Sequence, residues 1–313
     1  VSAGWVFSKE NFWNELGMED IINYGKLRAS YGLNASINSS YLGYYTLQGA
    51  YSAYKYNGAY GYRLSTLPNP NLKWEKTRTA EVGFDFGFLR DRFTLGLTYY
   101  NRLTMDKYAS LSLPKTTGFS SVTYNNGSYR NQGLEIDLNG TLLRTRDFQW
   151  TVSANLTYNK NTIVKLPENG LPNNRIGGTE IYTGNGNETH YVGGYQEGQT
   201  PGSFVGFGIV KMARTQADVD ALGDYIDICP NNGAYVYANE AGRQRSLAMG
   251  YKENALVQLM PGDFIYEDRN GDNLVDSKDR KILGNLTPKW TGGFNTTLKW
   301  KDFQLYARFD MGF

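Results

Sequence analysis

The sequence predicts an all-β, antiparallel fold on three observations. Its 313 residues include 25 Tyr, 15 Phe, 6 Trp and 36 Gly, a composition that favours strands and turns over helices. Several long segments alternate between apolar and polar residues, as strands with one apolar face do. The connections between these segments are alternately a few residues and tens of residues long.

Alternation is clearest in EVGFDFGF, where every second side chain from Val82 to Phe88 is apolar. The same pattern marks segments that begin at Phe93, Gly133, Phe148, Gly293 and Phe303, and a weaker copy begins at Tyr24. We count the stub VSAGWVF, which begins at Val1, as one further crossing. We therefore expect about eight strands with one apolar face.

Length and turn asymmetry favour a membrane setting for these strands. The segments approach the roughly 9 to 11 residues that a tilted strand needs to cross a bilayer. Their ends carry aromatic residues that suit an interfacial girdle: Trp74, Tyr99, Tyr100, Trp150, Tyr158, Trp290 and Trp300. The short turns LRDR, LLRTRD and KWKD match the periplasmic side of outer-membrane barrels, and the long connections match the outer side. The sequence thus predicts a section of an antiparallel transmembrane β-barrel with long extracellular loops.

Counting crossings gives the organisation of the chain. We expect barrel strands with a periplasmic connection in residues 1–34, a Tyr-rich extracellular loop in 35–80, barrel hairpins in 81–159, a long extracellular excursion in 160–290 and a barrel hairpin in 291–313. SFVGFGIVKM, from Ser203 to Met212, looks like a strand. A single crossing there would break the parity, so we assign it to an outer-loop subdomain.

Residues 268–279, DRNGDNLVDSKD, have the spacing of a calcium loop. Oxygen-bearing side chains stand at positions 1, 3, 5, 9 and 12, and position 7 normally supplies a backbone carbonyl. The predicted ligands are Asp268, Asn270, Asp272, Leu274 (through its carbonyl), Asp276 and Asp279. Asn273 at position 6 needs a positive φ, which it adopts less readily than glycine. No amphipathic helices flank the loop, which favours a static calcium site; the alternative is a solvated turn without metal.

A Tyr-rich stretch in the first long loop is a candidate contact surface for substrate or for a protein lid. The candidate residues are Tyr41, Tyr44, Tyr45, Tyr51, Tyr54, Tyr56, Tyr60 and Tyr62. Aromatic rings with a polar tip suit stacking on sugars and protein contacts. The alternative is that the rings pack the loop against itself.

Other classes of function find little support. A net charge of +2 argues against a nucleic-acid surface, and the lone Cys229 permits no internal disulfide. A hydrolytic triad would have to use His190, the single histidine, but the sequence has no GxSxG motif. We therefore expect no enzymatic activity. Glu135 and Asp137 should face the barrel lumen, where we expect them to be solvated or to face a plug.

Three long segments resemble the SusC/RagA class of TonB-dependent outer-membrane transporters. They are LPNPNLKWEKTRTAEVGFDFGFLRDRFTLGLTYYNR, LPKTTGFSSVTYNNGSYRNQGLEIDLNG and PGDFIYEDRNGDNLVDSKDRKILGNLTPKWTGGFNTTLKWKDFQLYARF. The likeness covers most of residues 24–313 in the family's order. The family loop usually reads DxNGDGxxD, and Asn273 replaces its second glycine.

The resemblance implies a barrel of about 22 strands, closed by a plug, in the outer membrane of a Gram-negative bacterium. It implies that further strands of the wall follow the hairpin in 291–313. It also implies import of glycans or peptides, energised through TonB by way of the plug and assisted by a SusD-like lipoprotein lid. Two rivals stay open on the residues alone. One is a self-contained small outer-membrane barrel that serves as an adhesin or structural anchor, and the other is a secreted, calcium-stabilised β-protein that binds carbohydrate.

Overall fold

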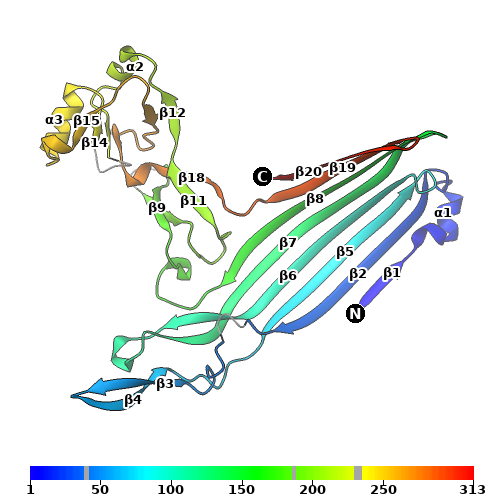
Figure 1. Ribbon diagram of the computed structural model, residues 1–313, viewed down its shortest axis with the longest axis horizontal. Helices are drawn as coiled ribbons and strands as arrows, with labels where there is room; N and C mark the ends of the chain where they lie inside the picture. The colour runs from blue at the N-terminus through cyan, green and yellow to red at the C-terminus, as the bar shows by residue number, and fades with distance from the viewer. Residues whose placement is uncertain (39–41, 185–187, 229–234) are drawn as a thin grey trace. The chain divides into compact units, whose positions relative to one another are not determined.

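Eight strands form one antiparallel sheet in the order β1-β2-β5-β6-β7-β8-β19-β20 (Figure 1). The computed structural model describes residues 1–38, 42–184, 188–228 and 235–313. The sheet belongs to a first unit, made of Val1–Arg175, Gln196–Thr200 and Thr287–Phe313, and a second unit is made of Ile176–Tyr195 and Pro201–Leu286. The predicted all-β antiparallel fold and the eight strands are confirmed.

The strands of the sheet are β1 (Ser2–Trp5), β2 (Ile22–Ser36), β5 (Glu75–Phe88), β6 (Phe93–Ser112), β7 (Ser121–Arg144), β8 (Phe148–Lys165), β19 (Trp290–Trp300) and β20 (Phe303–Gly312). β1 and β20 are the two edges, and they pair with β2 and β19 only. The sheet is therefore open, so the described residues do not form the self-contained small barrel that was one of the alternatives.

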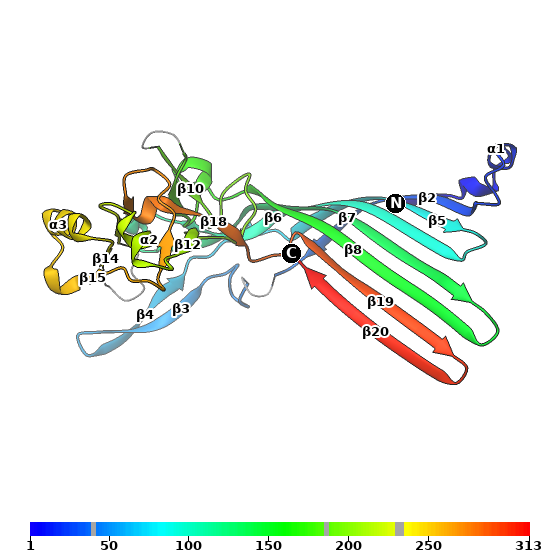
Figure 2. The ribbon, with the colours of Figure 1, turned by 90° about the horizontal axis from the view of Figure 1, so that it is seen from above.

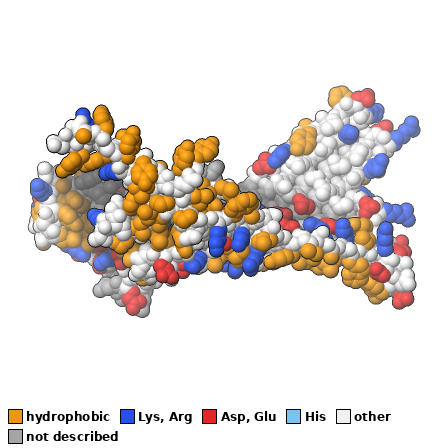
Figure 3. All heavy atoms as spheres, turned by 90° about the horizontal axis from the view of Figure 1, so that it is seen from below, with side chains coloured by type: hydrophobic (Ala, Val, Ile, Leu, Met, Phe, Trp, Pro, Cys, Tyr) orange, Lys and Arg blue, Asp and Glu red, His pale blue; other side chains and the backbone are white. Residues whose placement is uncertain are grey.

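The register sorts the side chains of the sheet onto an apolar and a polar face, because direct partners on neighbouring strands share a face. One row of partners is Leu27, Phe84, Leu97, Ile136 and Leu156. The adjacent row is Arg28, Gly83, Thr98, Glu135 and Thr157. At the right of Figure 3, hydrophobic side chains gather toward one margin of the sheet, and white and charged ones cover the rest. The alternation predicted from the sequence is confirmed.

Aromatic residues mark both ends of the apolar face. The ring of Tyr158 lies 4.8 Å from that of Trp290 at one end of β19, and the ring of Trp300 stacks on Phe303 at the other. From Trp290 to Trp300 the strand rises about 33 Å, which a tilt of about 40° reduces to about 25 Å, the height of a barrel's apolar band. Tyr100 does not belong to this girdle, because its register partner Gly133 lies on the polar face.

β6 and β7 extend well beyond the segments that alternation predicts. They continue as one hairpin to Ser112 and from Ser121, although the alternation is clear only in the segments that begin at Phe93 and Gly133. The register shifts between Thr104 and Lys107, next to Asp106 with its positive φ of 55°. This extension lacks a continuous alternation of apolar and polar residues, so the pattern could not reveal it.

A separate hairpin, β3 (Ala50–Tyr56) and β4 (Ala59–Thr66), occupies the Tyr-rich loop. The segment that follows it is fastened to the β6–β7 hairpin. Asn69 Nδ2 donates to the carbonyl of Thr123 at 2.8 Å, and Asn125 Nδ2 donates to that of Lys73 at 2.8 Å.

The short turns of the sheet lie together at one end, where η1 (Phe7–Lys9) and α1 (Asn11–Glu15) also lie (Figure 2). The first unit also contains the 3-10 turns η2 (Lys115–Thr117) and η3 (Pro172–Asn174). No helix in the described part of the chain is long and apolar enough to span a membrane.

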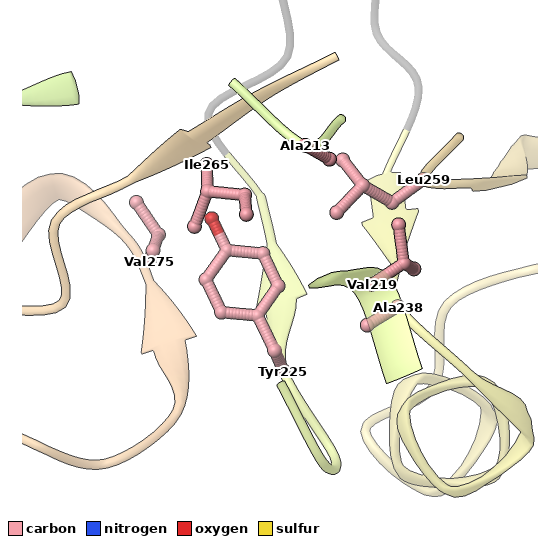
Figure 4. Packing of buried hydrophobic residues seen from close by; sticks show 7 residues of the cluster. All are labelled: Ala213, Val219, Tyr225, Ala238, Leu259, Ile265 and Val275. Atoms are coloured by element: carbon pink, nitrogen blue, oxygen red, sulfur yellow. The ribbon is translucent and has the colours of Figure 1, made fainter. Parts of the chain in front are cut away.

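The second unit is built from short elements around its own core. They are β9 (Thr179–Tyr182), β10 (Thr189–Val192), β11 (Ser203–Phe207), β12 (Ile209–Met212), α2 (Gln216–Asp220), β13 (Ile226–Asp227), β14 (Tyr235–Tyr237), α3 (Glu240–Ala248), η4 (Glu253–Ala255), β15 (Leu256–Gln258), β16 (Phe264–Tyr266), β17 (Leu274–Val275), η5 (Ser277–Asp279) and β18 (Arg280–Asn285). Its core consists of Ala213, Val219, Tyr225, Ala238, Leu259, Ile265 and Val275 (Figure 4). SFVGFGIVKM forms β11 and β12, which pair with β18 and β16, so as predicted it is no crossing of the sheet.

Candidate functional site

The polar face of the sheet carries a charged cluster centred on Arg28. Its Nε donates to Asp85 Oδ2 at 3.1 Å, and its Nη2 donates to Thr98 Oγ1 at 2.6 Å. The hydroxyl of Ser30, also on β2, lies 3.4 Å from Glu81 Oε2. Because these side chains come from three neighbouring strands, the cluster depends on the register of the sheet.

Gly83 makes this cluster possible. Gly83 is the direct partner of both Arg28 and Thr98, so it stands between them on the polar face. A Cβ at Gly83 would lie 2.8 Å from Arg28 Cζ, closer than real Cβ contacts come. The missing side chain lets the guanidinium cross β5 and reach β6.

A hollow on the polar face adjoins this cluster and is lined by Thr98, Tyr100, Arg102, Glu135 and Asp137, among others. Glu135 and Asp137 therefore share a face with Arg28, as their position opposite Leu134 and Ile136 in the alternation predicts. The hollow contains a positively charged hydrogen-bond donor, Arg102, and negatively charged acceptors, Glu135 and Asp137. Such a surface suits contact with polar material inside a barrel.

The tyrosines of the β3–β4 hairpin are divided between its two faces. Tyr51, Tyr60 and Tyr62 share one face, and Tyr54 and Tyr56 share the other. A cation lies near a ring on each face: Lys55 Nζ is 5.5 Å from the centre of the Tyr60 ring, and Arg63 Cζ is 5.0 Å from that of Tyr54. The exposed fractions of these five tyrosine residues run from 45% for Tyr54 to 81% for Tyr62.

Two further candidates, Tyr44 and Tyr45, precede the hairpin and are also exposed, and Tyr41 lies outside the described residues. The described rings therefore do not pack their own loop into a core, which was the alternative interpretation. Contact with substrate or lid stays a prediction.

The acidic loop folds as a tight turn around Asp268. Its Oδ1 accepts from the N–H of Gly271 at 2.8 Å, and its Oδ2 accepts from the N–H of Asn273 at 2.6 Å. Asn273 has a φ of 59°, the positive value that position 6 requires. Asp272 Oδ1 accepts from the N–H of Leu274 at 2.8 Å.

The backbone of β17 directs the carbonyl of Leu274 away from its neighbour strand. β17 pairs in parallel with β13, and the carbonyls of Asn273 and Val275 accept from Ile226 and Ile228. Because successive carbonyls of a strand point in opposite directions, that of Leu274 points away from β13. This leaves it available as the position 7 ligand.

Asp279 is buried and serves as a structural anchor of the loop. Its Oδ1 accepts from the N–H of Arg269 at 2.8 Å, and its Oδ2 accepts from the N–H of Asp276 at 2.7 Å. Burial raises the pKa of the Asp279 carboxyl, although these two hydrogen bonds oppose the shift. The nearby carboxylates of Asp268 and Asp276 raise it further.

The loop fits calcium in donor type and spacing but not in convergence. Nowhere in the described chain do three His, Cys, Asp or Glu side chains come together in a group that could hold a metal ion. The carboxylates are instead used within the loop: Asp268 accepts from the backbone of the turn, and Asp276 with Asp279 forms a capping box at η5.

The cluster of Arg28, Asp85 and Thr98 was not predicted from the sequence. Alternation places each of them on the polar face, but only the register brings them together. The one available signal was Gly83, a residue with no side chain in the middle of an otherwise strong strand.

The chain matches the family model "TonB dependent receptor-like, beta-barrel" over residues 13–252. It is 29% identical to TonB-dependent receptor P39 of Formosa agariphila, over 100% of this chain and 28% of that protein. It is also 29% identical to TonB-dependent receptor SusC of Bacteroides thetaiotaomicron, over 97% of this chain and 26% of that protein. The chain thus spans little more than a quarter of the length of these relatives.

Solved structures share the fold. The RagAB peptide importer in its open-open state superposes with a TM-score of 0.62 at 22% identity, over 99% of this chain and 27% of that one. A second structure of the RagAB peptide transporter gives a TM-score of 0.60 at 22% identity, over 99% of this chain and 28% of that one. The chain therefore belongs to the TonB-dependent receptor-like β-barrel family, as a section of an outer-membrane barrel of the SusC/RagA class.

Proposed function

We propose that the whole protein imports oligosaccharides or peptides across the outer membrane by TonB-dependent transport, together with a SusD-like surface lipoprotein. The observation that carries the proposal is the β3–β4 hairpin, which presents exposed tyrosines on both faces. An isolated two-stranded hairpin is marginally stable in water, so a partner or ligand on either face would stabilise it. Membership of the barrel family and the polar face around Arg28 support a transport role.

Two substrate classes are compatible with this surface. Tyrosine rings stack on sugar rings and on apolar peptide side chains, and the nearby Lys55 and Arg63 add charge. The RagAB structures that share the fold are described as a peptide importer, which favours peptides. The proposed function is transport and includes no catalytic step.

The test uses the full-length protein purified from its native outer membrane. Mass spectrometry identifies the peptide or oligosaccharide that copurifies with it, together with any lipoprotein partner. Uptake of that ligand by cells is then measured with and without a protonophore. Uptake that persists after the proton-motive force collapses would contradict TonB dependence, and the absence of any lipoprotein partner would contradict the lid.

The two faces of the hairpin provide matched variants. One replaces Tyr51, Tyr60 and Tyr62 by Ser, and the other replaces Tyr54 and Tyr56 by Ser. Each ring that contacts the ligand should contribute about 0.5–1.5 kcal/mol to the free energy of binding. If the ligand binds the face with Tyr51, Tyr60 and Tyr62, the triple variant should therefore lower its affinity about tenfold or more. The variant on the face that contacts the lid should instead lose the lipoprotein in a pull-down. Wild-type affinity and lid binding in both variants would refute a role for the hairpin.

We also propose that the loop from Asp268 to Asp279 binds calcium as a structural ion. Its oxygen donors, the positive φ of Asn273 and the free direction of the Leu274 carbonyl support this. Calorimetry of the calcium-depleted whole protein should show binding, and saturation at about 100 times the dissociation constant should stabilise the fold by about 2.7 kcal/mol. Asp272→Ala should abolish the heat of binding, and Asp220→Ala, outside the loop, should not. A wild-type protein without calcium-binding heat would leave the loop as a solvated turn.

A further inference from the structure

The connection between β1 and β2 is rich in aromatic residues that form one cluster. The ring centre of Phe7 lies 5.9 Å from that of Trp5 and 5.0 Å from that of Trp13. The ring centre of Phe12 lies 6.2 Å from that of Trp5 and 6.3 Å from that of Trp13. We refer to Trp5–Ile21 as the anchor segment.

The anchor segment packs on the apolar face of the sheet. The Phe7 ring lies 6.1 Å from that of Phe86, whose register partner is Gly25. A Cβ at Gly25 would lie 2.3 Å from Phe7 Cε2, so the ring rests directly on the backbone of β2. Trp5 itself pairs with Leu27, a member of the apolar row. The segment is therefore held against the lipid-facing side of the wall.

The outward surface of the anchor segment carries large apolar side chains beside exposed polar ones such as Glu15 and Glu19. Leu16 is 65% exposed, Ile21 58% and Phe12 43%. Phe12 and Leu16 are four residues apart in helical conformation, so they lie on one side of α1. Both indole N–H groups have acceptors: Trp5 Nε1 donates to Glu10 within the segment at 3.0 Å, and Trp13 Nε1 donates to the carbonyl of Ile22, the first residue of β2, at 3.1 Å.

We propose that the anchor segment binds phospholipid in the periplasmic leaflet of the outer membrane. Its exposed apolar surface continues the lipid-facing face of the sheet, and no boundary of polar residues separates Trp5 from Leu27 and Phe84. It lies at the end with the short turns, which is the periplasmic end of outer-membrane barrels (Figure 2). Tryptophan rings with satisfied N–H groups next to charged residues are typical of the membrane interface.

The test places a photo-crosslinking residue, p-benzoylphenylalanine, at three positions of the full-length protein in its native outer membrane. Phe12 and Leu16 are the test positions, and Asn14, on the opposite side of α1, is the matched control. After irradiation, the peptide that contains position 12 or 16 should gain the mass of one phospholipid. The peptide with the crosslinker at position 14 should not.

A second variant separates a docked segment from one that touches lipid by chance. Phe7→Ala removes the ring that rests on Gly25, so the phospholipid adduct at position 16 should fall although Leu16 is unchanged. Crosslinks from positions 12 and 16 to protein would overturn the proposal in favour of a protein partner. Equal lipid yields at all three positions, or no lipid adduct at 12 and 16, would also overturn it.

Discussion

The two units of this chain bury their hydrophobic residues in opposite ways. In the second unit, Val219, Ile226 and Val275 are completely inaccessible to solvent. In the described part of the first unit, only Tyr108 and Ile163 are buried hydrophobic residues. The sheet leaves its apolar side chains open, whereas the second unit encloses its own.

The difference follows from the solvent that each unit meets. A strand in a bilayer satisfies its backbone through its neighbours and leaves its apolar side chains to the lipid. A unit surrounded by water must instead enclose an apolar core. The sheet is thus stabilised by contact with lipid and the second unit by an enclosed core. Substitutions at matched positions can measure each contribution.

The largest expected effect is on the core of the second unit. Val219→Asp buries an unpaired carboxylate, which should cost about 3–5 kcal/mol in free energy of unfolding. Limited proteolysis of the whole protein should then cut within residues 201–286 and spare the eight-stranded sheet. Val210→Asp is the control, because Val210 is 62% exposed and should change stability by less than about 0.5 kcal/mol. Equal sensitivity of both variants would mean that this core does not stabilise the unit.

The next effect concerns the apolar face of the sheet. Leu97→Arg puts a cation into the lipid, which should cost about 2–4 kcal/mol near the middle of the bilayer. Thr94→Arg, on the same strand but on the polar face, should have little effect. Urea titration of the whole protein refolded into phospholipid vesicles measures both. Similar losses in the two variants would show that the two faces do not meet different media.

A smaller effect should follow from filling the gap at Gly83. Gly83→Val pushes on the Arg28 guanidinium and should cost about 1–3 kcal/mol. Gly32→Val is the matched control on the same face, where nothing lies within 4 Å of a Cβ. In an Arg28→Ala background the cost of Gly83→Val should shrink, because the clash is gone. Additive losses in the same vesicle assay would show that the two residues do not interact.

The strands of the sheet could be predicted from the sequence because contact with lipid requires an alternating pattern. The short elements of the second unit could not, because a unit in water requires no such pattern. The alternation around Phe84 and Phe294 located the strands because one face must be apolar. β13 has two residues and β14 has three, which is too short for a period of two to be recognised. The anchor segment was missed because its aromatics follow no period. Tyr100 was assigned to the girdle because it lies at a strand end, although the alternation from Phe93 puts Tyr99, and not Tyr100, on the apolar side.

The smallest expected effect is a pH dependence confined to the second unit. Hydrogen bonds from Arg243 and Gln244 lower the pKa of Glu240, at the start of α3, to about 2. The Lys211 ammonium and Thr215 lower that of Asp218 in α2. Both carboxyls have a lower pKa folded than unfolded, so they stabilise these helices above their usual pKa and lose that effect as the pH falls toward 2.

Amide exchange in α2 and α3, corrected for intrinsic rates, should therefore become faster between about pH 5 and about pH 2.5. Exchange in the paired strands β6 and β7 should change less, because their hydrogen bonds do not rely on these carboxylates. Glu240→Gln should make α3 exchange at acid rates already at about pH 5, since an amide cannot pair with the charge of Arg243. An α3 that exchanges equally in wild type and variant at both pH values would mean that the ion pair is too exposed to matter. Faster exchange at acid pH in α2 and α3, but not in β6 and β7, would show that these carboxylates stabilise the second unit and not the sheet.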